Sequence, residues 1–157
     1  MKHELIYYPD STLKLECEEV KLPLSKEDEE LLNEMYDYLK NNKEAVGLAA
    51  PQFGVLKRMI VIRHKDASTG EVFNCKMVNP RIVAKTTKTY VVPNGEHCLS
   101  EPELEGVEVK RVKEILLIGY DAMKKGNVTY PLSNFRAAIA QHELDHLNGV
   151  CLHNYIK

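Results

Sequence analysis

Residues 141–149 read QHELDHLNG, and the two histidines of this stretch, His142 and His146, are four positions apart. On an α-helix this spacing places both side chains on one face, so that both imidazoles can reach one metal ion. Glu143 follows the first histidine and lies about 100° around the helix, close enough to act on a water beside the metal. The alternative, two ordinary core histidines, is costly to bury without partners. This HExxH arrangement therefore predicts a C-terminal helix with a metal site on its buried face.

A metal ion held by two imidazoles needs a third protein ligand. The metzincin spacing HExxHxxGxxH would place it at position 152, which is Leu152, and His153 is one residue late. The eleven residues after His146 contain no acid, so the distant downstream ligand of other zinc peptidases is excluded. The third ligand is therefore expected upstream, among the cysteines, the other histidines and the carboxylates. Cys98 is favoured, because a thiolate binds well beside two imidazoles and leaves a fourth tetrahedral position open.

The composition is ordinary for a soluble globular protein, and residues 1–157 are expected to form a single domain, with 44% hydrophobic and 28% charged residues. The formal net charge is −2, and the basic residues are scattered, which argues against direct binding of nucleic acid. We find neither a signal peptide nor an apolar run that could span a membrane, so no membrane association is expected. The four cysteines lie far apart without a CxxC pair, which indicates reduced thiols in the cytoplasm.

The order of elements predicts an α+β fold, with antiparallel β-sheets around the C-terminal helix that carries HExxH. Ser25 followed by Asp28 resembles a capping box, and apolar residues at helical spacing continue to about Asn41. Ser133 can cap the C-terminal helix. Strands are expected at 59–63, 72–78, 81–89 and 107–120. Their short connections suggest antiparallel hairpins, whereas residues 47–54, GLAAPQFG, break the periodicity and are expected to form a shaped loop.

Three motifs together resemble those of the peptide deformylase family, which are a GxGLAAPQ loop, an EGCLS strand end and a QHExDHLxG helix. Here they read AVGLAAPQFG at 45–54, EHCLS at 96–100 and QHELDHLNG at 141–149, in the family's order. The opening IYYPDSTL at 6–13 is also similar, so the likeness covers nearly the whole chain. The resemblance implies removal of the N-formyl group from the N-terminal methionine of nascent bacterial-type polypeptides, with release of formate.

The resemblance also implies a role for each motif residue. Cys98 and the two histidines would hold the metal, and Glu143 would be the general base. The side-chain amide of Gln52 and the backbone N–H of Leu99 would stabilise the developing oxyanion. The family's metal is ferrous iron, which zinc, nickel or cobalt can replace. The implied partners are N-formylmethionyl peptides on ribosome-associated nascent chains in the cytoplasm.

The side chain of formylmethionine needs an apolar pocket. Candidates for its lining are Val46, Leu99, Phe135, Ile139 and the aliphatic edge of His142. The substrate peptide would lie extended beside Gly47 and His97. Two glycines of the family motifs are replaced here, by Ala45 and His97, and glycine at such places allows unusual backbone angles or close approach of a ligand. We therefore expect intact chemistry with altered peptide binding. A deformylase-like binding protein with weak turnover is the alternative, and a metallopeptidase is the third.

Overall fold

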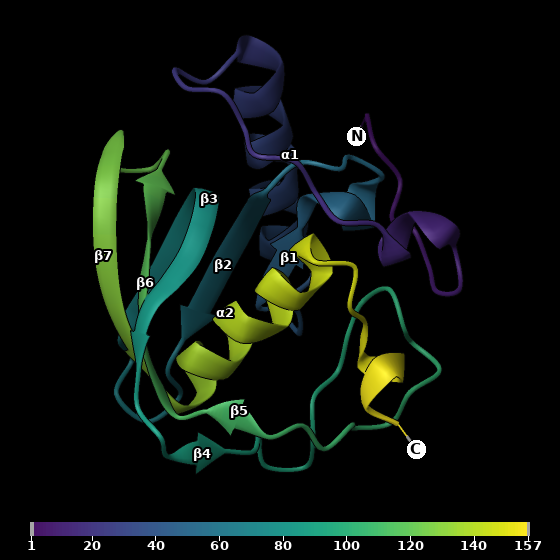
Figure 1. The fold of residues 1–157 in the computed structure, drawn as a ribbon, viewed down its shortest axis with the longest axis vertical. Coiled ribbons are helices and arrows are strands. Elements are labelled where there is room, and N and C mark those ends of the chain that lie inside the picture. The colour runs from purple at the N-terminus through teal and green to yellow at the C-terminus, as the bar shows by residue number, and fades with distance from the viewer. Residues whose placement is uncertain (1, 157) are drawn as a thin grey trace.

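The computed structural model describes residues 2–156 and is built on a five-stranded sheet in which all neighbouring strands are antiparallel (Figure 1). The strand order is β1-β2-β3-β6-β7, and a separate small sheet pairs β4 with β5. The elements are α1 (Lys26–Asn41), α2 (Asn134–Leu147), β1 (Gly47–Ala49), β2 (Met59–Lys65), β3 (Val72–Lys85), β4 (Thr89–Tyr90), β5 (Arg111–Val112), β6 (Glu114–Asp121) and β7 (Gly126–Ser133). The predicted α+β class, with antiparallel strands and a C-terminal helix, is confirmed.

The two long helices cover opposite faces of this sheet. The helix α2 crosses one face, and α1 packs on the other face, over β1 and β2 (Figure 1). In β2, Ile60 and Ile62 pack in the hydrophobic cluster of α2, whereas Met59 and Val61 pack in the cluster of α1. Because successive side chains of a strand point to opposite faces, a strand buried on both faces is apolar at consecutive positions.

The helix α1 lies where the sequence predicts it. Ser25 is the N-cap residue, and its side-chain oxygen accepts a hydrogen bond from the backbone N–H of Asp28 at 3.1 Å. Leu32, Met35 and Leu39 are completely buried on the face that meets the sheet. The predicted capping and the helical spacing of the apolar residues are both confirmed.

The strand β3 corrects one prediction. We expected two strands, at 72–78 and 81–89, but β3 runs without interruption through both as far as Lys85. Asn79 has a φ of 52°, and the pairing register with β6 shifts at this point, so the segment forms a bulge and not a turn. The side chain of Asn79 also hydrogen-bonds both backbone groups of Val20, at 2.8 and 2.9 Å. This contact with a distant segment holds the bulge.

Three further segments differ from the prediction. Residues 47–54 were expected to be a loop, but they form β1 and a 3₁₀ helix at Ala50–Phe53. The expected strand at 107–120 is divided into β5 and β6. The strand β7 was not predicted, because Pro131 argues against a strand at this place. As an edge strand β7 tolerates a proline, since one side of its backbone needs no partner.

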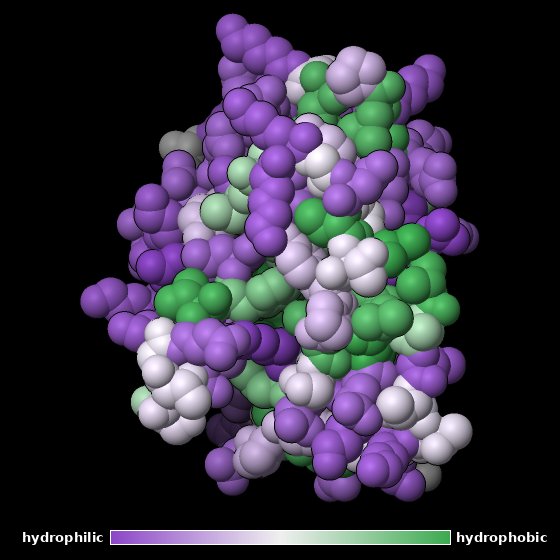
Figure 2. Space-filling model, turned by 90° about the vertical axis from the view of Figure 1, so that its left-hand side faces the viewer, coloured by the Kyte–Doolittle hydropathy of each residue, from purple (hydrophilic) through white to green (hydrophobic). Residues whose placement is uncertain are grey.

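Figure 2 shows the side of the molecule on which β7 lies. Hydrophilic side chains cover much of this face, and hydrophobic side chains gather toward one side of it. The exposed large hydrophobic residues of β3 are Val72 and Val83. Within residues 2–156, no helix has the length and apolar character needed to cross a membrane.

Candidate metal centre

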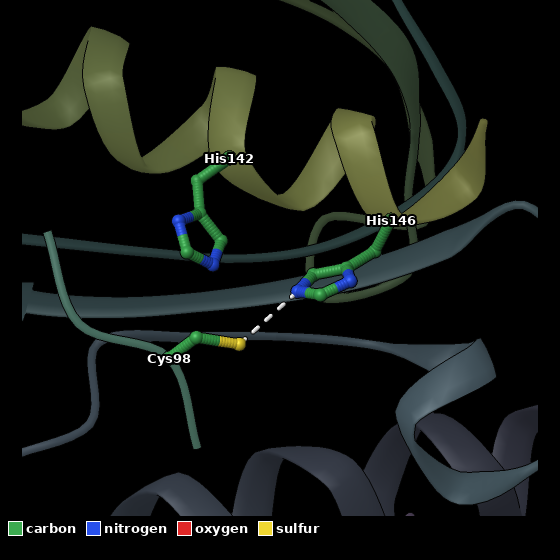
Figure 3. Close-up of side chains that lie close together, drawn as sticks. All are labelled: Cys98, His142 and His146. Carbon is green, nitrogen blue, oxygen red and sulfur yellow. Dashed lines mark hydrogen bonds between the residues drawn. The ribbon is translucent and has the colours of Figure 1, made fainter. Parts of the chain in front are cut away.

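The helix α2 brings the two histidines of the HExxH motif to one buried face. His142 and His146 are 9% and 1% exposed, and their ring centroids are 5.2 Å apart. Cys98 reaches the same place from the segment between β4 and β5 (Figure 3). Its Sγ lies 3.4 Å from Nε2 of His146, and one ligand atom from each of the three residues lies within 4.8 Å of the others. The three predicted metal ligands therefore meet at one point.

The chemistry of these three groups fits a divalent transition metal, which binds one thiolate and two imidazoles well. Burial raises the pKa of the Cys98 thiol, and the Glu143 carboxylate raises it further, so a thiolate here needs a positive ion beside it. Burial lowers the pKa of His146 well below its usual value, and the charges of His142 and Arg111 lower it further. A neutral imidazole is the form that binds a metal.

A buried ion pair of Glu96 and Arg111 orients the first histidine. Nδ1 of His142 lies 2.9 Å from Oε1 of Glu96, which leaves the other ring nitrogen available to a metal. Arg111 donates to both oxygens of Glu96, at 2.9 and 2.8 Å, and to Asp145 at 2.7 Å. Burial alone would lower the pKa of His142, but the hydrogen bond to Glu96 and the nearby carboxylates raise it above its usual value. Such carboxylate–histidine pairs commonly support a metal-binding imidazole.

Glu143, the predicted general base, lies beside these donors. It is 4% exposed, and within the described residues its Oε1 has no hydrogen-bond partner. Burial raises the pKa of Glu143 to about 7, a value suited to proton transfer near neutral pH. The space for this carboxylate exists because Gly47, on β1, has no side chain.

Gln52 is fixed at both ends of its amide. Oε1 accepts a hydrogen bond from the backbone N–H of Ala49 at 2.9 Å, so Nε2 must point the other way. Nε2 donates to Oγ of Ser100 at 3.0 Å and lies 3.9 Å from Sγ of Cys98. An amide nitrogen carries two hydrogens, so a second donor remains beside the metal ligands. The backbone N–H of Leu99 donates to no backbone carbonyl within residues 2–156.

A cavity of about 720 Å³ opens beside these groups. Its walls come from residues 44–47, the segment 92–104 and one face of α2. The predicted site residues that line it are Val46, Gly47, Gln52, His97, Cys98, Leu99, Phe135, Ile139, His142 and Glu143. His146, the remaining predicted site residue, is almost completely buried and contacts Cys98. The structure thus brings residues from three separate motifs around one cavity.

Comparison with known proteins decides the family. The family model of polypeptide deformylase matches residues 2–157. The chain belongs to the polypeptide deformylase family. It is 36% identical over 156 residues to the peptide deformylase of Macrococcus caseolyticus, in a match that covers 92% of this chain and 84% of that protein.

Solved deformylase structures have the same fold. The crystal structure of a probable peptide deformylase from Synechococcus phage S-SSM7 has a TM-score of 0.85 at 32% identity, covering 99% of this chain and 100% of that one. The Met-Ala-Ser-bound class I type b peptide deformylase from Acinetobacter baumannii has a TM-score of 0.84 at 26% identity, covering 99% of each chain. The resemblance seen in the three motifs is confirmed. The activity of this chain is that of its family, a metal-dependent amidohydrolase that deformylates peptides.

Both departures from the deformylase motifs, Ala45 and His97, lie on the cavity wall. His97 is exposed, and its φ is not positive. The non-glycine residues with positive φ in the described part of the chain are Asn79, Asn94, Lys125 and Asn134. His97 therefore has an ordinary backbone conformation, and it is part of the cavity wall.

Sequence reasoning missed the groups that support the deformylase motifs. Glu96 and Ser100 lie within the EHCLS motif itself, and their polar side chains beside Cys98 were a usable signal. Arg111 gave no such signal, because it lies 15 residues after Glu96 and outside any motif. Only the fold shows that this guanidinium is buried against the site.

Proposed function

We propose that this chain removes the N-formyl group from the methionine at the start of nascent polypeptides and releases formate. The observation that carries the proposal is the meeting of three motifs at one cavity, with a thiol, two imidazoles, a carboxylate and an amide around it. The relative from Acinetobacter baumannii holds the peptide Met-Ala-Ser, which supports a substrate that begins with methionine. The substrates are nascent chains at the ribosome, in the cytoplasm.

Cys98, His142 and His146 are proposed to hold one ferrous ion, and the same donors suit zinc, nickel or cobalt. When bound, the ion acts as a Lewis acid that polarises the formyl carbonyl and lowers the pKa of water. A thiolate ligand is open to oxidation, so the iron-loaded protein is expected to lose activity in air or peroxide.

Glu143 is proposed as the group that moves the proton. Its carboxylate takes a proton from water as the water oxygen bonds to the formyl carbon. It then gives this proton to the peptide nitrogen as the C–N bond breaks, which yields formate and a free amino group. Its pKa of about 7, which burial raises, suits both steps near neutral pH.

Gln52 and Leu99 are proposed to stabilise the negative charge that develops on the formyl oxygen. Nε2 of Gln52 lies 3.9 Å from Sγ of Cys98, Leu99 follows Cys98 directly in the chain, and both the amide and the backbone N–H are donors. Gln52 is held by Ala49 and Ser100, so its amide does not have to reorganise during the reaction. Fixed donors of this kind are an effective way to lower such a barrier.

The methionine side chain is proposed to bind between α2 and the segment of Cys98. Phe135, Ile139 and His142 follow one another at helical spacing and share one face of α2. Val46 and Leu99 complete the apolar lining. Gly47 and His97 are proposed to lie along the peptide that follows the methionine.

The proposal is tested with protein purified without oxygen, loaded with Fe(II) and given formyl-Met-Ala-Ser, with unformylated Met-Ala-Ser as the control. We expect formate from the first peptide and intact recovery of the second. Free amino acids from Met-Ala-Ser would indicate a peptidase instead. Tight binding of formyl-Met-Ala-Ser without any formate would indicate a binding protein, and either result contradicts the proposal.

A further inference from the structure

Three distant segments of the chain meet beside the loop that carries Cys98. The N-terminal segment contributes Tyr8, the loop contributes Glu101, and the 3₁₀ helix at Leu152–Tyr155 contributes His153. His153 is the histidine whose position does not fit a metzincin site. The structure places it outside the group of three metal donors and pairs it with Glu101 instead.

Glu101 is a carboxylate without exposed surface. Its Oε1 accepts a hydrogen bond from the backbone N–H of His153 at 2.9 Å and lies 2.7 Å from Nδ1 of the same residue. Its Oε2 accepts a hydrogen bond from the backbone N–H of Leu152 at 3.1 Å. A buried carboxylate is costly unless it has such partners. Because these partners lie in the C-terminal turn, Glu101 ties the loop to that turn.

His153 is fixed on three sides. Nδ1 contacts Glu101, and Nε2 lies 3.2 Å from Oε1 of Glu103. Its ring stacks on the ring of Tyr8, with centroids 3.6 Å apart and planes 6° apart. The backbone N–H of Tyr8 in turn donates to the carbonyl of Ser100 at 2.8 Å. The imidazole therefore joins the loop and the N-terminal segment.

The part of the loop that is tied in this way is short and carries two groups of the site. The backbone N–H of Glu101 donates to the carbonyl of Cys98 at 3.0 Å, which closes a turn over residues 98–101. Oγ of Ser100, within this turn, accepts the hydrogen bond of Gln52. Movement of Glu101 would therefore displace both the thiol and the support of Gln52.

We propose that Glu101 and His153 are positioning residues that hold the Cys98 sulfur where a metal ion needs it. The inference rests on the proposed role of Cys98 as a metal ligand. Glu101 is three residues from Cys98 and lines the same cavity, so its pairing acts directly on the site.

Binding of Co(II) tests the inference, because a cobalt–thiolate bond has its own charge-transfer absorption. Metal-free full-length protein is titrated with Co(II) against a competing chelator, as wild type, His153→Ala and Glu101→Gln. We expect both variants to bind Co(II) about 10-fold or more weakly, with a weaker thiolate absorption. Glu101→Gln keeps the size of the side chain, so it remains informative if His153→Ala folds poorly.

His3→Ala is the matched control, because Nδ1 of His3, in the N-terminal segment, lies 2.8 Å from Oε1 of Glu34 on α1, in a histidine–carboxylate pair of the same chemistry. His3→Ala is expected to lower Tm but to keep Co(II) affinity and spectrum. Wild-type Co(II) affinity and spectrum in His153→Ala and Glu101→Gln would overturn the inference and leave the metal site in place. A wild-type cobalt–thiolate absorption in Cys98→Ser would instead overturn the proposed metal site, and the inference with it.

Discussion

A Cβ atom at position 47 would lie 2.7 Å from Oε2 of Glu143, which is closer than real Cβ contacts allow. Gly47 therefore gives the carboxylate of Glu143 its place against β1. The sequence motif suggested that Gly47 lies along the substrate peptide. In the structure Gly47 has a second role, because any side chain at this position would displace Glu143, the proposed base.

Gly47→Ala is expected to lower kcat for formate release by about 100-fold, because a misplaced base loses most of its contribution. Metal affinity should stay near the wild-type value, since the atoms nearest to the added Cβ belong to Glu143, which is not one of the three metal donors. Gly126→Ala is the matched control: a Cβ there meets nothing within 4 Å, and its φ is not positive. Wild-type kcat in Gly47→Ala would contradict the role given to the close approach.

Glu96→Gln is expected to weaken metal binding by about 10-fold to 100-fold, because His142 loses the carboxylate that orients it. It also leaves Arg111, which is 4% exposed, with Asp145 as its remaining carboxylate partner, so the free energy of unfolding should fall by about 1–3 kcal/mol. Urea unfolding of the metal-free protein and competition with a chelator measure the two effects.

The control for Glu96→Gln is Glu71→Gln, which removes the exposed partner of Arg136. An exposed pair of this kind contributes about 1 kcal/mol or less, so the free energy of unfolding of Glu71→Gln should stay close to the wild-type value. If Glu96→Gln is no less stable than Glu71→Gln and binds metal as tightly as the wild type, the support of His142 by Glu96 is contradicted.

Ser100 is expected to act through Gln52. Gln52→Ala should lower kcat by about 100-fold to 1,000-fold, as expected for the loss of an oxyanion donor. Ser100→Ala should lower kcat by a smaller factor, because it removes only the hydroxyl that holds Nε2 of Gln52. The double variant should be no slower than Gln52→Ala alone, because the two residues form one unit. Rate losses that multiply in the double variant would mean that Ser100 acts independently.

His97→Gly is expected to change KM and leave kcat near its wild-type value, because His97 lies on the exposed wall of the cavity and outside the reacting groups. A set of formyl-Met tripeptides that differ in the second and third residues measures this effect. The differences in KM among these tripeptides should not be the same for His97→Gly as for the wild type. A large fall in kcat with constant KM would place His97 in the chemistry instead.

The three metal ligands could be predicted because the sequence signals that mark them are local. His142 and His146 share a helix face by spacing alone, and Cys98 stands in a short motif of its own. The helix α1 was predictable for the same reason, since Ser25 and the apolar spacing are local signals.

The features that could not be predicted from the sequence depend on contacts between distant segments. The bulge at Asn79 is held by Val20, and local turn residues alone suggested a hairpin there. Arg111 joins the site only because β5 passes beside α2. The clash that makes Gly47 necessary arises from the packing of α2 on β1, which no pattern in either segment reveals.

The most direct test of the central claim compares formate release by wild type and Glu143→Gln, both loaded with Ni(II) and given formyl-Met-Ala-Ser. Both proteins should bind Ni(II) with the same affinity, because Glu143 is not one of the three donors. We predict formate release by the wild type and a kcat at least about 100-fold lower in Glu143→Gln. Equal rates of formate release by the two Ni(II)-loaded proteins would contradict the account.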